Sequence, residues 1–407
     1  MNKIESGFKI WFTASRDGVI LRSEREGRDT LSIENLAGEL TVSLYYDVNE
    51  KPLRLRSRVS VYEEIEIIIF PHRIELWVNN TLKDEEWPFG NPLFDREDRL
   101  EALVDYEIKP YERRPHPQPS VTDSFTGGAE GWHPEPNVFC GDCMPHVADG
   151  RFHLLYLRDR HHHESKWGLG AHSWSHISTV DFDRWDIHPT AVDIDLPEEA
   201  SICTGSYIQK DGMHYLYYTV RPTADGIPAK ILRSVSTDGY HYEKDEKFGF
   251  TLSDKYRGGG ARDPKIFLAE DGLYHMIITA ALVSPRLGVL AHLTSADLDV
   301  WRELEDDIYL SPDEREPECP DYFKLGEYYY LTYCISGEAH YMYSKKPFSD
   351  WISPEDDTVP CGKVPKCAEW EGRLIFVGFK PLGGYAGFLT YRAARQEADG
   401  SLSFETT

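Results

Sequence analysis

Hydrophobic and polar residues alternate along the first part of the chain with the two-residue period of a β-strand. The strings ELTVSLYYDV (39–48) and EEIEIIIFPHRIELWVNN (63–80) show this best, and the second ends in Asn79-Asn80, a pair that favours turns. No long stretch of this part has the period of a helix. The pattern predicts a small N-terminal β-sandwich over residues 1–108.

A polar, proline-rich segment follows and breaks the alternation. It contains the string KPYERRPHPQPSVTDSF (109–125). Such a composition favours extended backbone. We expect residues 109–129 to form a linker or strap.

The rest of the chain repeats itself. Five times a short strand pattern leads into a glycine turn and then an aromatic-rich strand, with turns at Gly150, Gly212, Gly272, Gly326 and Gly372. A repeat of roughly 50 to 60 residues with about four strands is typical of one propeller blade. The repeats therefore predict a five-bladed β-propeller over residues 130–395 with a C-terminal tail over 396–407. An open array of β-sandwich strands is the alternative.

Composition fits this all-β prediction and excludes some partners. Of the 407 residues 41% are hydrophobic, enough for a sizeable core, and the net charge is −25. That charge repels phosphate backbones and anionic lipids, so we expect no nucleic-acid or membrane partner. The 10 Trp and 24 Tyr suit either β-strands or a sugar-binding cleft. Self-association into a homo-oligomer stays open.

The cysteines and the start of the chain bear on its compartment. The chain shows no apolar run long enough for a transmembrane helix, and MNKIESGFKIWF lacks the apolar core of a signal peptide. Seven cysteines, an odd number, indicate free thiols in a reducing compartment. We expect a cytoplasmic protein.

Three acidic residues stand eight or nine positions before a glycine turn, namely Asp142, Asp263 and Glu318. Because the inner strand of each blade lines the central channel, the sequence predicts that they occupy equivalent places in three blades and converge at one end. Carboxylates crowded in a partly dry funnel have pKa values that are pushed apart, as acid/base glycoside cleavage requires. Turn capping or pairing with arginine is the alternative for each residue alone.

At this point the sequence resembles a known family. ARDPKIF resembles the Arg-Asp-Pro motif of glycoside hydrolase family 32, EPECPDYF its Glu-Cys motif, and SICTGSYI its second-blade Ser-Gly motif. WGLGAHSWSHISTVDFDRW (167–185) is similar to its Trp-Gly segment, and GDCMPHVADGRFHLLY takes the place of its Asn-Asp-Pro-Asn-Gly motif. The resemblance covers about residues 130–395.

The resemblance implies roles for these residues. Asp142 falls on the nucleophile and Glu318 on the general acid/base, while Asp263, beside Arg262, falls on the transition-state stabiliser. A retaining double displacement on a fructofuranosyl unit of a small carbohydrate is implied. Two features depart from the family: Gly141 stands where its motif has asparagine, and the β-rich module precedes the propeller.

Further sugar contacts are expected around this funnel. The candidates are Arg262, Ser206, His146, and Arg158, Trp167 and His176 from the histidine-rich string LRDRHHHESKWGLGAHSWSHI (157–177). The histidines His161–His163 could bind a metal, but no helical ligand spacing supports this, and we expect a polar loop without metal or cofactor.

Two other functions stay open. An inverting arabinanase or xylosidase on the same propeller would also use two aspartates and a glutamate. A non-catalytic carbohydrate-binding propeller is the second, although binding alone needs no acid/base pair.

Overall fold

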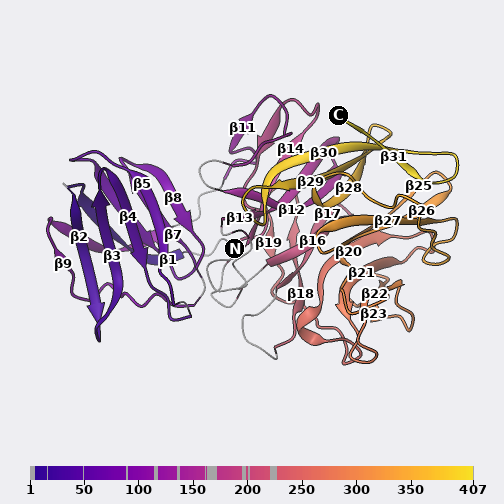
Figure 1. Ribbon diagram of the computed structural model, residues 1–407, viewed down its shortest axis with the longest axis horizontal. Coiled ribbons are helices and arrows are strands. Elements are labelled where there is room, and N and C mark those ends of the chain that lie inside the picture. The colour runs from indigo at the N-terminus through magenta and orange to yellow at the C-terminus, as the bar shows by residue number, and fades with distance from the viewer. Residues whose placement is uncertain are drawn as a thin grey trace.

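The structure is a computed structural model that describes residues 5–15, 17–48, 50–88, 90–113, 118–134, 138–160, 162, 172–194, 199, 202–220 and 227–406. Figure 1 shows two bodies side by side, the smaller formed by the N-terminal residues. Across the described ranges the regular structure is β-strand, apart from a 3-10 turn at Gly258–Gly260. The predicted all-β fold is confirmed.

The smaller body is a sandwich of two five-stranded sheets, ordered β10-β1-β6-β7-β8 and β5-β4-β3-β2-β9. Its inward residues, such as Ile10 and Phe12, form one core, as the two-residue period requires. The predicted boundary at residue 108 falls inside a strand, because β10 pairs with β1 as far as Arg113. The strands are β1 (Glu5–Thr13), β2 (Gly18–Arg25), β3 (Arg28–Leu36), β4 (Glu39–Leu44), β5 (Leu53–Arg58), β6 (Glu64–Ile69), β7 (Ile74–Val78), β8 (Thr81–Glu86), β9 (Glu101–Ala102) and β10 (Tyr106–Arg113).

The larger body consists of five antiparallel blades. Blade one holds β11 (Asp123–Phe125), β12 (Phe139–Ala148), β13 (Arg151–Asp159), β14 (Ser173–Thr179) and β15 (Trp185–Ile187). Blade two holds β16 (Ile202–Lys210), β17 (Met213–Val220), β18 (Lys230–Ser236) and β19 (Glu243–Lys244). Blade three holds β20 (Arg262–Leu268), β21 (Tyr274–Ala281), β22 (Gly288–Ser295), β23 (Arg302–Glu303) and β24 (Tyr309–Leu310). Blade four holds β25 (Glu318–Leu325), β26 (Tyr328–Ile335) and β27 (Glu338–Ser344), and blade five holds β28 (Lys363–Trp370), β29 (Arg373–Pro381), β30 (Gly387–Gln396) and β31 (Leu402–Thr406).

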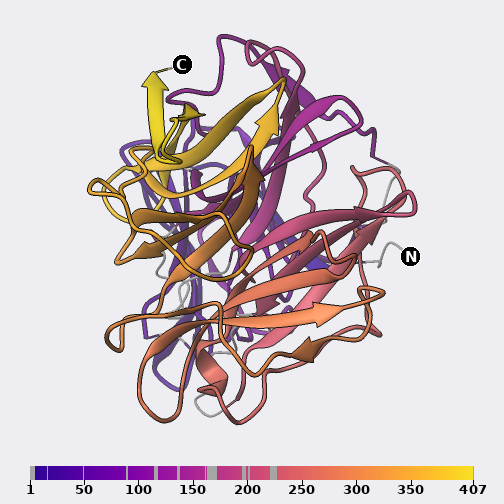
Figure 2. The same cartoon turned by 90° about the vertical axis from the view of Figure 1, so that its right-hand side faces the viewer.

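Hydrophobic packing closes these blades into a ring. Five separate core clusters each lie between two neighbouring blades, including one between blade five and blade one. The inner strands β12, β16, β20, β25 and β28 contact one another in cyclic order. Figure 2 faces this ring and shows the chain colour advancing around its centre. At the seam between the last blade and the first, Cys140 of β12 pairs with Gly387 of β30.

The glycine turns explain how the blades begin. Asp149-Gly150, Asp211-Gly212 and Glu371-Gly372 are two-residue hairpin turns in which both residues have positive φ. This is the conformation that matches the twist of a hairpin and favours glycine. The predicted repeat is thus a hairpin between the first two strands of a blade.

Two details differ from the sequence prediction. Blade four forms a three-stranded sheet, and the place of a fourth strand is taken by two isolated bridges, Tyr343 with Ile352 and His340 with Thr358. Residues 396–407, predicted as a tail, contain β31, which pairs with β30 and completes blade five.

Buried charges fasten the sandwich to blade one. The Arg160 guanidinium pairs with Asp84 and Glu86 of β8, and all three side chains are at most 5% exposed. Trp87 packs into the core between blades one and two, with the Arg158 guanidinium 4.7 Å from its ring centre. The two bodies therefore share a core and an ion-pair network.

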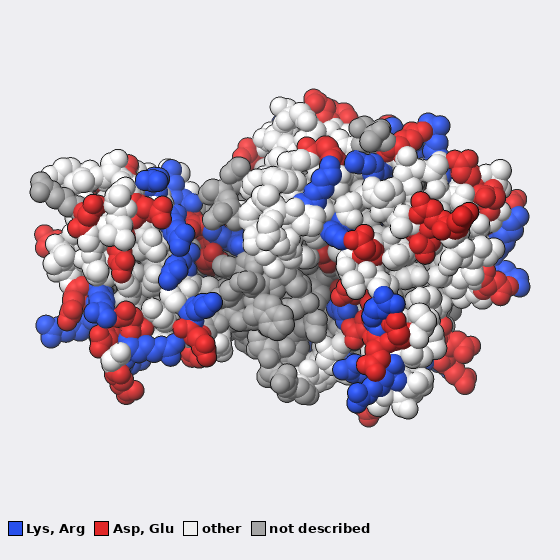
Figure 3. All heavy atoms as spheres, viewed as in Figure 1, with Lys and Arg blue, Asp and Glu red and all other residues white. Residues whose placement is uncertain are grey.

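The outer surface carries mixed charge. On the face in Figure 3, acidic and basic side chains are interspersed over both bodies. Across the described part of the chain, no helix is long and apolar enough to cross a membrane.

Candidate active site

Each inner strand contains a β-bulge at the same place. The register with the next strand shifts by one residue between Cys140 and Cys143, and likewise in the other four blades at 202–205, 262–265, 318–321 and 363–366. A bulge bends its strand and redirects side chains. Five equivalent bulges therefore line one end of the central channel.

The three predicted carboxylates sit on these bulges but not at equivalent positions. Glu318 is the last paired residue before its bulge, Asp263 is one position later and Asp142 two positions later. The prediction of equivalent places is wrong, because Gly150 is the second residue of the turn in blade one whereas Gly326 is the first in blade four, and the bulge of β25 lies one residue closer to its turn.

The aspartates of blades one and three nevertheless meet around Cys319. Its thiol sulfur lies 3.3 Å from Asp142 Oδ2 and 3.4 Å from Asp263 Oδ2, and its backbone N–H donates to Asp263 Oδ2 at 3.1 Å. Asp263 and Cys319 both have positive φ, which the bulges impose. The Thr204 hydroxyl of blade two donates to Asp142 Oδ2. Residues of four blades thus fix two carboxylates.

Arg262 connects Glu318, the third carboxylate, to Asp263. Its Nη2 donates to Glu318 Oε1 at 2.8 Å, its Nη1 bonds Glu316, and its Nε lies 3.6 Å from Asp263 Oδ2. Burial alone lowers the pKa of Arg262, but the surrounding carboxylates, Asp263 first, outweigh it and raise that pKa. Arg262 therefore remains a cation shared by three acidic groups.

Exposure separates the three candidates. The Asp263 and Asp142 residues are 3% and 8% exposed, whereas the Glu318 side chain is 37% exposed. Burial, and to a lesser extent the charge of Asp142, raises the pKa of Asp263, although Arg262 and Lys366 oppose that rise. The site thus has two recessed aspartates and one glutamate open to solvent.

Two lysines fill the channel just past the bulges. Lys366 is 2% exposed and its Nζ donates to the Gly205 carbonyl at 3.1 Å, while Lys265 Nζ lies 2.5 Å from Asp321 Oδ1. Burial lowers the pKa of Lys366. Burial alone raises the pKa of Asp321, but both lysines outweigh it and the pKa is lowered. Positive charge therefore lies next to the recessed aspartates.

Two predicted sugar contacts have other partners. The Ser206 hydroxyl accepts from the Ile266 N–H and donates to the Pro264 carbonyl, both at 2.9 Å, so it ties blade two to blade three. The Arg158 guanidinium binds Glu85 of the sandwich and stacks on Trp87. The structure does not bring these two side chains to the carboxylates.

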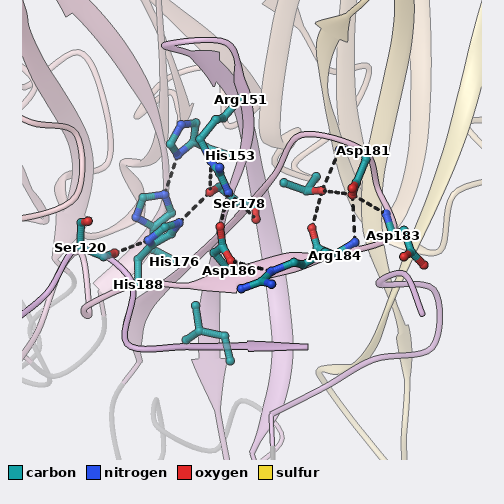
Figure 4. A network of polar contacts seen from close by, with 12 residues as sticks. Ser120, Arg151, His153, His176, Ser178, Asp181, Asp183, Arg184, Asp186 and His188 are labelled. Atoms are coloured by element: carbon teal, nitrogen blue, oxygen red, sulfur yellow. Dashed lines mark hydrogen bonds and ion pairs between the residues drawn. The ribbon is translucent and has the colours of Figure 1, made fainter. Parts of the chain in front are cut away.

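His146 and His176 lie in a buried histidine cluster of blade one, which also contains His153 and His188. His146 stacks on Tyr207 with ring centres 3.8 Å apart, and His153 Nδ1 is 2.9 Å from His176 Nε2. Figure 4 shows His153, His176 and His188 pointing toward one another. Their described contacts are with one another and with neighbouring residues such as Tyr207, and none of these is with the three carboxylates.

The remaining candidates are only partly described. Trp167, His161 and His163 lie outside the described residues. His162 donates its backbone N–H to Asp159 Oδ2 at 2.8 Å. In the described ranges, no group of three or more His, Cys, Asp or Glu side chains is placed to hold a metal ion.

Sequence reasoning missed three residues of the site: Thr204, Glu316 and Tyr385. Thr204 lies two positions before Ser206, and only the bulge turns it toward Asp142. Glu316 lies beside the Glu-Cys string, where its pairing with Arg262 could have been suspected. Tyr385, whose hydroxyl lies 2.7 Å from Asp142 Oδ1, stands in no repeat position and gave no signal.

Two recessed aspartates and an exposed glutamate lie around one arginine at one end of the channel, and paired carboxylates are the groups that glycoside cleavage uses. The comparison with known families points to a class of protein with that chemistry. Residues 128–353, more than half of the chain, match the glycosyl hydrolases family 32 N-terminal domain. The chain therefore belongs to glycosyl hydrolase family 32.

Individual relatives match only part of this chain, and the match covers only part of each relative. Sucrose-6-phosphate hydrolase of Escherichia coli is 26% identical over 315 residues, 67% of this chain and 61% of the relative. The protein of that name from Salmonella typhimurium is 31% identical over 212 residues, 47% of this chain and 41% of the relative. Fructan 1-exohydrolase IIa from Cichorium intybus shares the fold with a TM-score of 0.57 at 16% identity, over 69% of this chain and 60% of that one. The chain spans less than two thirds of the length of these relatives.

Proposed function

We propose that the chain is a retaining glycoside hydrolase that cleaves a fructofuranosyl unit from a small oligosaccharide. The observation that carries the proposal is the meeting of Asp142, Asp263 and the Arg262–Glu318 pair at one end of the channel of a family 32 propeller. The names of the relatives, sucrose-6-phosphate hydrolase among them, favour a fructosyl substrate.

In the first step Asp142 attacks the anomeric carbon while Glu318 gives its proton to the leaving oxygen. Fixed orientation favours this role for Asp142, because Thr204 binds one of its oxygens and Tyr385 the other. A covalent glycosyl-enzyme forms and the leaving group departs with the proton of Glu318.

In the second step Glu318 takes a proton from water, which attacks the same carbon and releases Asp142. The exposure of Glu318 supports this double role, because both the leaving group and the incoming water must reach it from solvent. The Arg262 bond holds its carboxylate without burying it.

Asp263 is assigned to the sugar hydroxyls. It lies within the same Cys319 contacts as Asp142, so a ring held by Asp263 presents its anomeric carbon to Asp142. The raised pKa of Asp263, caused mainly by burial, suits a carboxyl that shares protons with hydroxyl groups.

The test begins with purified protein and sucrose, inulobiose, levanbiose and aryl arabinosides, with the first-formed product anomer read by NMR. We expect cleavage of a fructosyl substrate with retention. Inversion, or cleavage of the arabinosides alone, would overturn the proposal and favour the inverting alternative.

Variants then test the roles. Asp142→Asn should abolish turnover and leave sugar binding largely intact. Glu318→Gln should slow substrates with poor leaving groups far more than activated aryl glycosides, whose departure needs little protonation. Near wild-type turnover by Asp142→Asn would refute the nucleophile assignment.

We further infer a reducing, cytoplasmic compartment. All seven cysteines are free and buried, including Cys140 and Cys143, which are close in sequence. Proteins of oxidising compartments tend to pair such thiols.

A further inference from the structure

Tyr385 reaches the candidate nucleophile from the opposite side of the ring seam. It lies between β29 and β30 of blade five, whereas Asp142 belongs to blade one. Its hydroxyl donates to Asp142 Oδ1 at 2.7 Å and accepts the backbone N–H of Asp142 at 3.1 Å. One phenol therefore fixes both the side chain and the backbone of that residue.

Gly141 makes room for this contact. A Cβ on residue 141 would lie 2.6 Å from the Tyr385 hydroxyl and 3.0 Å from two of its ring carbons. The 2.6 Å distance is shorter than real Cβ contacts, so any other residue there would displace the tyrosine or the strand. Tyr385 can therefore occupy this position only because residue 141 is glycine, where the family motif has asparagine.

Two histidines hold the tyrosine in place. The His162 Nδ1 lies 2.8 Å from the Tyr385 carbonyl, and the His172 ring stacks on the Tyr385 ring with centres 5.7 Å apart. Asp159 ties the two together, since it bonds His172 Nε2 at 2.7 Å and accepts the His162 N–H at 2.8 Å. Part of the histidine-rich segment therefore supports Tyr385.

We propose that Tyr385 is a positioning residue for the nucleophile, orienting the Asp142 carboxylate so that one oxygen faces the anomeric carbon. This rests on the proposed function of Asp142. Thr204 and Cys319 contact Oδ2, and Tyr385 contacts Oδ1, so the plane of the carboxylate is fixed from two sides. Burial, and then the charge of Asp142, raises the pKa of Tyr385 well above its usual value, so the phenol stays a donor throughout the working pH range.

The main test is Tyr385→Phe with sucrose as the probe. We expect kcat to fall about 10- to 100-fold with KM within about twofold, because a donor to a charged group is lost. Tyr328→Phe, at the hairpin end of blade four, is the matched control and should change neither quantity.

Substitutions at Gly141 test the steric side. Gly141→Ala should lower kcat about as much as Tyr385→Phe, yet cost nothing further in a Tyr385→Ala background, where the clash is gone. Additive effects of the two changes would overturn the inference.

Two outcomes separate this inference from the proposed function. An active Asp142→Asn variant would refute the nucleophile assignment itself. An inactive Asp142→Asn variant together with wild-type kcat and KM in Tyr385→Phe would overturn only the role of Tyr385.

A cycle of Asp142→Ala and Tyr385→Phe in urea unfolding needs no substrate. We expect the unfolding constants to deviate from additivity by about tenfold. Additivity would show that the two groups do not interact and would likewise overturn the inference.

Discussion

Acid should destabilise this propeller through the buried histidine cluster of blade one, formed by His146, His153, His176 and His188. All four are at most 8% exposed. Burial first, and then the neighbouring His188, lowers the pKa of His153 to about 3. Burial likewise lowers the pKa of the other three.

The sign of the effect follows from proton linkage. His153 is neutral in the folded state, while the unfolded chain takes up a proton once the pH falls below about 6.5. Its contribution to stability is therefore complete above that pH and is lost as the pH falls toward 3. Because pH 5 lies about 1.5 units below the pKa of histidine in the unfolded chain, the free energy of unfolding falls there by about 2 kcal/mol for this one residue.

The perturbation is His153→Phe, which keeps an aromatic ring to stack on His146 but cannot titrate. At pH 8 the variant should be less stable by about 1–3 kcal/mol, because His176 loses its partner. That deficit should shrink by about 2 kcal/mol at pH 5, since the variant no longer takes up this proton on unfolding. The assay is urea unfolding followed by tryptophan fluorescence at pH 5, 6, 7 and 8 and constant ionic strength.

His241 supplies a control of opposite sign. The hydrogen bond that its ring N–H donates to Asp238 raises the pKa of His241, so its contribution is present below about pH 6.5 and lost as the pH rises through the raised value. The loss of stability caused by His241→Gln should therefore be present at low pH and disappear at high pH. Identical pH slopes for wild type and His153→Phe between pH 5 and 6 would refute the reasoning.

Other parts of the structure give further expectations. Arg160→Met removes the cation that pairs with two buried carboxylates and should cost about 3–5 kcal/mol in thermal unfolding, with the sandwich becoming sensitive to limited proteolysis; unchanged stability would contradict the docking role. Ser206→Ala removes the partner of the Ile266 N–H and should cost roughly 1–3 kcal/mol in urea unfolding, with KM unchanged; a raised KM with full stability would instead indicate a sugar contact. Lys366→Met removes a charge that lowers the pKa of Asp263, so the pKa of Asp263 should rise in the variant. As the pH is lowered, any activity that depends on ionised Asp263 should then be lost at a higher pH than in wild type, as a pH–rate profile would show.

The blades could be predicted because their signal is local. A hairpin turn with two residues at positive φ favours glycine, and glycine stands in each of three such turns of the blades. The sandwich was also readable, since its two-residue period follows directly from burial of one sheet face.

The arrangement of the carboxylates could not be predicted in the same way. A β-bulge depends on the pairing with the next strand, and counting from a glycine cannot reveal it. This is why Asp142 and Glu318 seemed equivalent, and why Thr204 was passed over in favour of Ser206. Asp142 and Glu318 both stand eight positions before a glycine, yet they differ by two positions relative to the bulge of their strand.

Contacts between side chains of different blades, or of a blade and the sandwich, could not be predicted from the repeat pattern. Arg158 belongs to the string expected at the funnel, yet the sandwich supplies its partner Glu85. Tyr385 is 243 residues from Asp142, and its role requires a ring that closes. Such contacts depend on tertiary structure alone.

The contact between Tyr385 and Asp142 also determines when, during folding, the candidate active site is completed. Because 243 residues separate them, the nucleophile cannot be held in place until blade five has been synthesised and docked on blade one. Contacts so distant in sequence form late, after the entropy of a very long loop has been overcome. During refolding, recovered hydrolysis should therefore lag behind the fluorescence of the individual blades. Enzymatic activity would then serve as a clock for the last step of folding, in which an open chain of blades becomes a ring.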